Sequence, residues 1–267
     1  YVPSMKSAVA EGHPVVVFET QASVRGVPAV YISTGVHGDE AAAPWGLLQW
    51  AEAHLDQLRE EAFVLCPCLN PVGLMMNTRA DYRGVDIGVL SKYPIDSVVS
   101  HKGDAFPLNG TQGPNYYFSR DCPEIHIQFN GRKMVFLGAH FKAKSNDDPI
   151  KRLAEAQRTR AIADGLAKAD PSRAIAVLGD FNDTPNSPPY LAVIGSGATQ
   201  YTDVTLSVLQ ADRWTYDFQG SLELIDYQMV NPVLAPMLDT KSVVIRHAPN
   251  VEAASDHSPV IATYMVN

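Results

Sequence analysis

Short apolar runs alternate with longer helical patterns in the first third of the chain. Runs at residues 15–19 and 29–34 are rich in β-branched side chains and predict a strand pair or hairpin that turns around Arg25-Gly26. A third run at 62–68 predicts another strand, ended by Asn70-Pro71. Residues 40–60 between them predict a helix, because apolar side chains recur there at helical spacing. These are Leu47, Leu48, Ala51, Leu55 and Leu58.

The remaining two thirds of the chain predict a strand-rich α/β fold. Asn130-Gly131 separates apolar runs at 124–129 and 133–138, which is the pattern of a tight hairpin. A helix is expected at 149–168 and a buried strand at 174–178. Further strands are expected at 85–90, 222–230, 241–245 and 259–265. Composition changes near residues 78–84, so we expect domains at 1–82 and 83–267, which could merge into one globular unit.

Composition fits a folded protein that lacks a membrane span. The 267 residues are 46% hydrophobic and 19% charged, enough for one large or two modest cores. No apolar run reaches the roughly 20 residues of a membrane helix. No signal peptide is visible, which makes the cytoplasm the default expectation and leaves the compartment undetermined.

Charge and cysteine content narrow the function classes further. Acidic residues outnumber basic ones by 29 to 21, and the net charge of −8 argues against an extended basic face for duplex nucleic acid. No protein partner is indicated. Three cysteines, Cys66, Cys68 and Cys122, do not make a disulfide framework, and we interpret Cys66 and Cys68 as buried thiols rather than metal ligands.

The stretch VLGDFNDTP ends an apolar strand with Asp180 and Asn182, two residues apart and on one side of the backbone. A carboxylate there can bind a hard cation, while the amide can hold a phosphate oxygen or a water molecule. The same residue types also end strands and form turns without any catalytic role.

Three other sites carry similar chemistry at strand ends. His140 ends the run FLGAHF, and Asp226 interrupts an otherwise apolar strand, where an unpaired carboxylate would be costly. Asp256 precedes His257 just before the last strand, a pattern in which an acid can orient and charge an imidazole. This order of motifs is more specific than any single one of them.

Residues 83–267 resemble the endonuclease/exonuclease/phosphatase superfamily, the DNase-I-like phosphodiesterases. The resemblance rests on the motifs RGVDIGVLSKYPI, FSRDCPEIHI, GAHFKAK, GDFNDTP, LIDYQMVN and SDHSPV. It implies a two-sheet α/β/β/α sandwich with Mg²⁺ or Mn²⁺ at its mouth, acting on a small phosphodiester or on nucleic acid.

By position, the resemblance also implies roles for individual residues. His257 resembles the base that activates water, with Asp226 orienting it, and Asp256 resembles a metal ligand. Asp180 and Asn182 resemble the pair that positions the nucleophile and a phosphate oxygen. The resemblance further implies that His140, held by Asp86, stabilises developing negative charge. It also implies that two basic side chains lie near the phosphate. These are Arg120 and Lys142.

The first 82 residues depart from that family. Its fold normally opens with a strand ending in Asn and a later one ending in Gln-Glu, whose Glu is the principal metal ligand. Glu19 in VVVFETQ is the nearest imitation. Instead, VYISTGVHGDEAAAPWGLLQWAE and FVLCPCLNPVGLMMNTRAD resemble the start of zinc carboxypeptidase-like deacylases, the succinylglutamate desuccinylase and aspartoacylase branch. There His37 and Glu40 would bind Zn²⁺, and Arg79 would grip the substrate or an oxyanion.

We interpret the chain as a chimera of two partial hydrolase domains joined near Arg79–Asp86, natural or engineered, with an engineered recombination favoured. The leading hypothesis is a DNase-I-like phosphodiesterase or phosphatase, impaired by the missing Glu. A zinc deacylase using His37 and Glu40 and a chimeric fold without selected activity are the alternatives. His37 and Glu40 could restore a metal site near Asp256, although an inherited, non-functional turn is the favoured interpretation.

Overall fold

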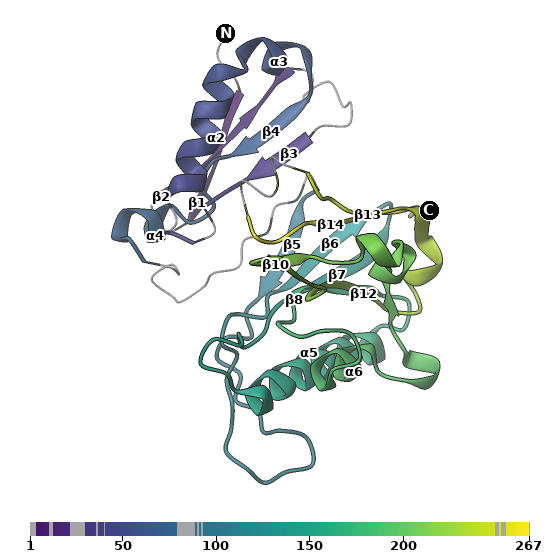
Figure 1. Ribbon diagram of the computed structural model, residues 1–267. Coiled ribbons are helices and arrows are strands. Elements are labelled where there is room, and N and C mark those ends of the chain that lie inside the picture. Colours follow the sequence, from purple (N-terminus) through teal and green to yellow (C-terminus); the bar gives the residue numbers. More distant parts are fainter. Residues whose placement is uncertain are drawn as a thin grey trace. The chain divides into compact units, whose positions relative to one another are not determined.

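The computed structural model describes residues 4–10, 13–21, 30–35, 37–39, 41–78, 89, 91, 93–248, 251 and 255–266. The chain forms two compact units, Tyr1–Val89 and Leu90–Asn267 (Figure 1). Among the described residues no helix is both long and apolar enough to cross a membrane.

The first unit contains a four-stranded sheet in the order β1-β2-β4-β3. Its strands are β1 (Ser4–Ala10), β2 (His13–Glu19), β3 (Val30–Ser33) and β4 (Phe63–Cys66). The predicted pairing of the second and third of these is wrong: β2 forms a hairpin with β1, and β4 lies between β2 and β3. Since β3 and β4 run parallel, the helical segment between them forms a crossover connection.

That crossover is two helices rather than the single one predicted. Helix α2 (Ala42–Ala53) ends at His54, and α3 (Leu55–Glu60) follows at once. A short third helix, α4 (Pro71–Met76), follows Asn70. The Asn70 side chain caps it by accepting a hydrogen bond from the Gly73 amide. The small core beneath α2 is Leu47, Phe63 and Leu65.

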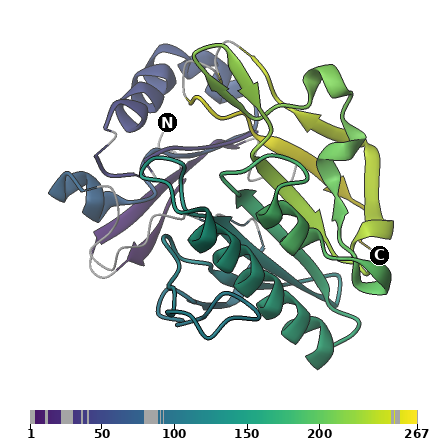
Figure 2. The ribbon, with the colours of Figure 1, turned by 60° about the horizontal axis from the view of Figure 1, so that its bottom comes forward.

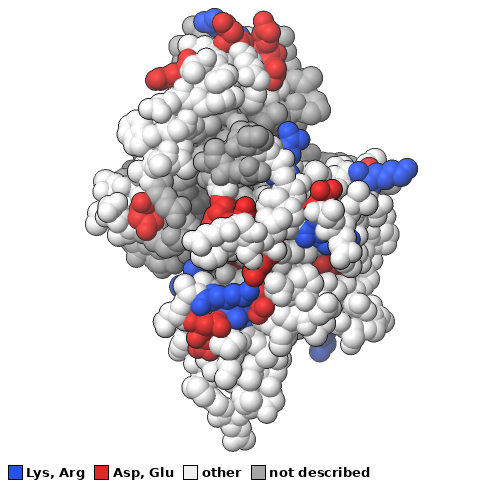
Figure 3. All heavy atoms as spheres, in the orientation of Figure 1, with Lys and Arg blue, Asp and Glu red and all other residues white. Residues whose placement is uncertain are grey.

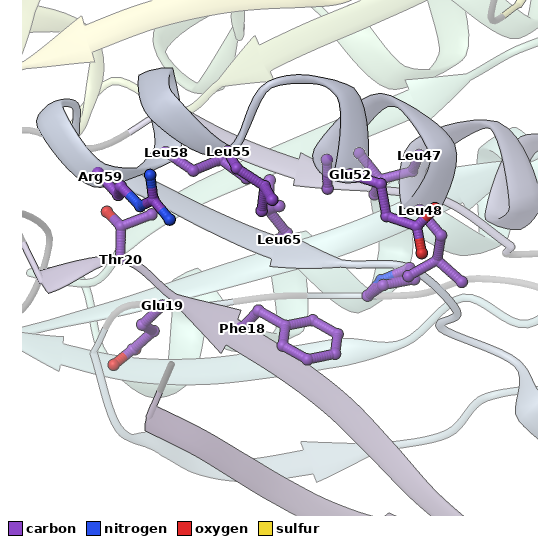
Figure 4. A pocket seen from close by; sticks show the side chains of 12 residues that line it. Phe18, Glu19, Thr20, Leu47, Leu48, Glu52, Leu55, Leu58, Arg59 and Leu65 are labelled. Atoms are coloured by element: carbon purple, nitrogen blue, oxygen red, sulfur yellow. The ribbon is translucent and has the colours of Figure 1, made fainter. Parts of the chain in front are cut away.

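A cavity of about 350 Å³ lies between α2, α3 and the strands β2 and β4 (Figure 4). Leucine and phenylalanine side chains line most of it, and Glu19, Glu52 and Arg59 lie among its polar lining residues. The apolar side chains predicted for the helical segment therefore line this cavity, and they leave space between the helices and the sheet.

The second unit is built on a six-stranded sheet in the order β5-β6-β7-β8-β12-β9. Its strands are β5 (Ile95–Val99), β6 (Glu124–Phe129), β7 (Arg132–His140), β8 (Ala174–Asp180), β9 (Thr202–Asp203) and β12 (Asp226–Val230). The hairpin predicted at Asn130-Gly131 joins β6 to β7, and both turn residues have positive φ. The central strands β7 and β8 are parallel and connected by helix α5 (Pro149–Ala169).

Helices cover one face of this sheet, and a second sheet covers the other. Figure 2 shows α5 and α6 (Pro188–Ile194) side by side. Tyr227 of β12 packs its ring on Tyr190 of α6, whereas the next residue, Gln228, hydrogen-bonds Val260 and Tyr264. Because neighbouring residues of a strand point to opposite faces, the sheet of β13 (Leu238–Ile245) and β14 (Val260–Tyr264) lies opposite α6.

Several predicted boundaries change in this unit. The strand expected at 222–230 is two strands, β11 (Ser221–Glu223) and β12, because β11 leaves the large sheet to pair with β10 (Tyr216–Phe218). The strand expected at 85–90 lies outside the described residues except for Val89. The predicted α/β class with more than one sheet is confirmed.

Candidate functional site

Strand pairing brings together side chains that are far apart in the sequence. His140 ends β7 and Asp180 ends β8, and the two residues are register partners in this parallel pair. Asp226 opens the neighbouring antiparallel strand β12 and is the register partner of Asp180 on its other side. Three polar side chains from different parts of the chain thus meet in one row across the sheet.

The fourth member of the row, His257, comes from the segment before β14. Its backbone forms an isolated bridge with Tyr216, and the two rings lie 4.8 Å apart. The imidazole Nδ1 lies 2.8 Å from Asp226 Oδ2. Side-chain ligand atoms of Asp180, Asp226 and His257 all lie within 4.8 Å of one another, a spacing that can hold a metal ion.

Local backbone geometry fixes Asp180 at this point. Its Oδ1 accepts a 2.6 Å hydrogen bond from the Asn182 amide, and Asn182 has a φ of +52°, which asparagine tolerates better than most residues. The preceding Gly179 has a φ of +132°, and a Cβ there would lie 2.0 Å from the Ala139 carbonyl oxygen. Only glycine therefore fits before Asp180.

The other polar groups of the site converge on the backbone of Phe141. The Asn182 side-chain amide donates to the Phe141 carbonyl over 2.9 Å, and Arg120 Nη1 donates to the same oxygen over 3.3 Å. The Phe141 amide in turn donates to the Asp180 carbonyl. The His140 ring also lies beside Asp180, with Nε2 3.6 Å from Asp180 Oδ2.

Burial and neighbouring charges shift the pKa values of Asp180 and His257. Burial, together with the negative charge of Asp226, raises the pKa of Asp180 to about 7. Burial acts to lower the pKa of His257, but the hydrogen bond and charge of Asp226 outweigh it and raise that pKa to about 9. The site thus concentrates negative charge that a cation can neutralise.

The remaining predicted site residues lie in four different situations. Lys142 Nζ donates to the carbonyl oxygens of Ala143 and Ser145, so its ammonium is held by its own loop. The Asp256 side chain is exposed and does not belong to the three-residue cluster, although its charge contributes to the high pKa of His257. His37 lies in the turn after β3 in the first unit. Glu40, Arg79 and Asp86 lie outside the described residues.

Tyr216 is a neighbour of the site that was not among the predicted site residues. Burial and the charge of Asp256 raise its pKa, and its ring covers one side of His257. The sequence signal was weak, because the strand pattern of residues 216–218 alone does not show that they pair with the segment before β14.

Comparison with known proteins yields two family matches in different parts of the chain. A model of the Endonuclease/Exonuclease/phosphatase family matches residues 70–251, and a model of the Succinylglutamate desuccinylase/Aspartoacylase catalytic domain matches residues 26–86. Both predicted resemblances are confirmed, and their order fits a chimera. No curated protein sequence matches the chain.

Solved structures are similar over parts of the chain. Truncated Caenorhabditis elegans TDP2 is 14% identical, with a TM-score of 0.48, over 67% of this chain and 69% of that chain. The catalytic domain of human Nocturnin is 14% identical, with a TM-score of 0.47, over 66% of this chain and 62% of that chain.

A Shewanella baltica protein, provisionally called a metallopeptidase, is 31% identical with a TM-score of 0.27 over 31% of this chain and 32% of that chain. The chain thus spans less than two thirds of the length of some of these structures. The family match at residues 70–251 covers more than half of the 267 residues and includes His140, Asp180, Asn182 and Asp226. The chain belongs to the endonuclease/exonuclease/phosphatase family.

Proposed function

We propose that the second unit is a divalent-metal-dependent hydrolase of phosphate esters, with phosphodiesters as its preferred substrates. The observation that carries the proposal is the cluster of Asp180, Asp226 and His257, whose ligand atoms lie within 4.8 Å of one another. Membership of the family agrees with this chemistry at a coarser level.

The donor set of the cluster fits a hard divalent cation. Asp180 and Asp226 offer carboxylate oxygens, the ligand type that Mg²⁺ and Mn²⁺ prefer. The pKa of Asp180, raised to about 7, shows that its negative charge is poorly stabilised by the protein alone. We propose that these two carboxylates hold the cation, with Asp256 as a further candidate ligand. When bound, the metal would supply positive charge to the phosphate oxygens and would lower the pKa of His257.

The residues of the site can divide the work of an in-line attack on phosphorus. Asp226 holds His257 by Nδ1, which leaves Nε2 as the ring nitrogen that exchanges a proton with the attacking water. Asp180 and Asn182 orient that water and a phosphate oxygen. His140 and Arg120 add positive charge or hydrogen-bond donors where negative charge develops.

The distribution of charged side chains and the net charge of the protein favour some substrate classes over others. In the view of Figure 3, the basic side chains of the described residues lie singly or beside acidic ones rather than as an extended patch. The net charge of −8 also disfavours tight binding of duplex nucleic acid. A small phosphodiester or a single-stranded nucleic acid remains the best substrate.

The zinc deacylase alternative rests on the family match at residues 26–86. It requires a third metal ligand beside His37 and Glu40. The described residues of the first unit contain no group of three such ligands. The phosphoesterase is therefore the better supported proposal, and a chimera without selected activity is the outcome if neither reaction occurs.

The decisive experiment is hydrolysis of bis-p-nitrophenyl phosphate with Mn²⁺ or Mg²⁺, comparing the wild type with Asp180→Ala. Metal-dependent turnover that falls by at least about 10²-fold in the variant supports the proposal. Equal rates in both proteins reject it. A parallel assay of N-acyl amino acid hydrolysis with Zn²⁺ tests the alternative, using His37→Ala as its matched variant.

A further inference from the structure

Helix α5 buries two charged residues near loops of the candidate site, Glu155 and Arg152, in addition to Arg160. The whole residue Glu155 is 0% exposed and Arg152 is 3% exposed. Buried charges are costly unless they are fully hydrogen-bonded, so apolar side chains would be the cheaper choice on this helix face. The contacts of these two residues indicate what the charges do.

Glu155 joins two separate loops. Its Oε1 accepts a hydrogen bond of 2.6 Å from the Ser119 amide, and its Oε2 accepts one of 2.6 Å from the Lys142 amide. A carboxylate is the side chain that can accept from two N–H groups in this way, because a carboxamide has only one oxygen. The two amides lie 23 positions apart in the sequence, so one side chain of α5 joins two distant segments.

Arg152, one turn earlier on α5, holds the opposite side of the same peptide segment. Its Nη1 donates to the Lys142 carbonyl over 3.0 Å and to Asp147 over 2.6 Å. Its Nε donates to Asp183 Oδ2 over 3.1 Å. Both backbone groups of Lys142 are therefore bonded to α5, and so is the residue after Asn182.

Each of the three loops held in this way carries a group of the candidate site. Arg120 follows Ser119, and Asn182 precedes Asp183. Both side chains donate to the carbonyl of Phe141, which precedes Lys142. A shift of the Lys142 peptide would therefore move the acceptor on which Arg120 and Asn182 depend.

We propose that Glu155 is a positioning residue of the phosphoesterase site, and that it acts by fixing the Ser119 and Lys142 amides so that Arg120 and Asn182 meet at the Phe141 carbonyl. This inference rests on the proposed function. Arg152 completes the arrangement by holding Lys142 and Asp183 from the same helix.

The test compares Glu155→Gln, which keeps one acceptor oxygen, with Glu155→Met, which keeps none. Thr159→Val is the matched control: Thr159 is one turn later on the same buried face and bonds the Glu155 carbonyl and the Cys122 thiol, but neither of the two amides that Glu155 holds. The assay is Mn²⁺-dependent hydrolysis of bis-p-nitrophenyl phosphate, with melting temperatures measured alongside. Should Glu155→Met fail to fold, Arg152→Lys serves as the second variant.

We expect kcat to fall by about tenfold in Glu155→Gln and by more in Glu155→Met or Arg152→Lys, while KM changes by less than about threefold. Thr159→Val should keep the wild-type kcat whatever its melting temperature. Wild-type kcat in Glu155→Gln, or an equal loss in Thr159→Val, would overturn the positioning role and leave the proposed function intact. A wild type without Asp180-dependent turnover would instead remove the proposed function itself.

Discussion

Nδ1 of His257 lies 2.8 Å from Oδ2 of Asp226, although 31 residues separate them in the chain. A carboxylate bonded to one ring nitrogen sets the tautomer and orientation of the imidazole and favours its protonated form. Under the proposed function, this arrangement would supply a base for water, and charge at the metal position would change the pKa of that base.

Replacing the carboxylate of this pair should lower activity and shift its pH dependence. In Asp226→Asn the negative charge that raises the pKa of His257 is lost, so that pKa should fall from about 9 toward its ordinary value. We expect kcat of Mn²⁺-dependent phosphodiester hydrolysis to drop by about 10²-fold or more. The pH–rate profile checks this, and Asp239→Asn, an exposed acid on β13, serves as control. An unchanged profile in Asp226→Asn would contradict the pairing.

Without metal, stability should fall as pH rises through two windows. The folded pKa of Asp180, about 7, lies above its ordinary value of 3.8, so the folded state holds the proton longer, and stability decreases between about pH 4 and 7. The folded pKa of His257, about 9, lies above 6.5, so its contribution is complete below pH 6.5 and is lost as pH rises through 9. Melting temperatures in EDTA at pH 4.5, 7 and 10 test this.

Asp180→Asn provides the matching variant. It should raise the melting temperature in EDTA at pH 8 while abolishing the gain that Mn²⁺ gives the wild type, because the amide carries no charge for burial to oppose or for the metal to neutralise. A variant that melts at the wild-type temperature in EDTA would show that the carboxylate is not strained by its surroundings.

Gly179→Ala should destabilise the second unit by an amount on the order of 3 kcal/mol, because the backbone conformation disfavours a side chain and the added Cβ meets the Ala139 carbonyl. Urea unfolding measures this change. The control is Gly165→Ala in α5, where a Cβ meets nothing within 4 Å. That change should stabilise the protein by about 0.5–1 kcal/mol through helix propensity. Equal changes in the free energy of unfolding for Gly179→Ala and Gly165→Ala would refute the close approach at Gly179.

Filling the cavity of the first unit should stabilise that unit. Ala51 lines the space between α2 and the sheet, so Ala51→Leu should add about 0.5–2 kcal/mol to the free energy of unfolding. Ala53→Leu, on the exposed side of the same helix, is the control and should change little. Hydrogen exchange of the β4 amides provides the measurement, and faster exchange in Ala51→Leu would mean that the larger side chain does not fit.

The sequence by itself determined the class of fold and most of the site. The hairpin at Asn130-Gly131, the helix before the strand of Asp180 and the strand-end positions of His140, Asp180 and His257 follow from local rules of turn chemistry and side-chain period, which act within a few residues. The motif order was sufficient to identify the family.

Tertiary structure decided what local rules cannot reach. In the first sheet, β4 lies between β2 and β3. Residues 222–230 form two strands that pair with different partners, and the second of them places Asp226 beside Asp180. Tertiary structure also turned Glu155 and Arg152 inward, although surface exposure is the ordinary expectation for charged residues on a helix. The backbone groups that they bond belong to loops 10 or more residues away, and only the packed fold brings those groups within hydrogen-bonding distance.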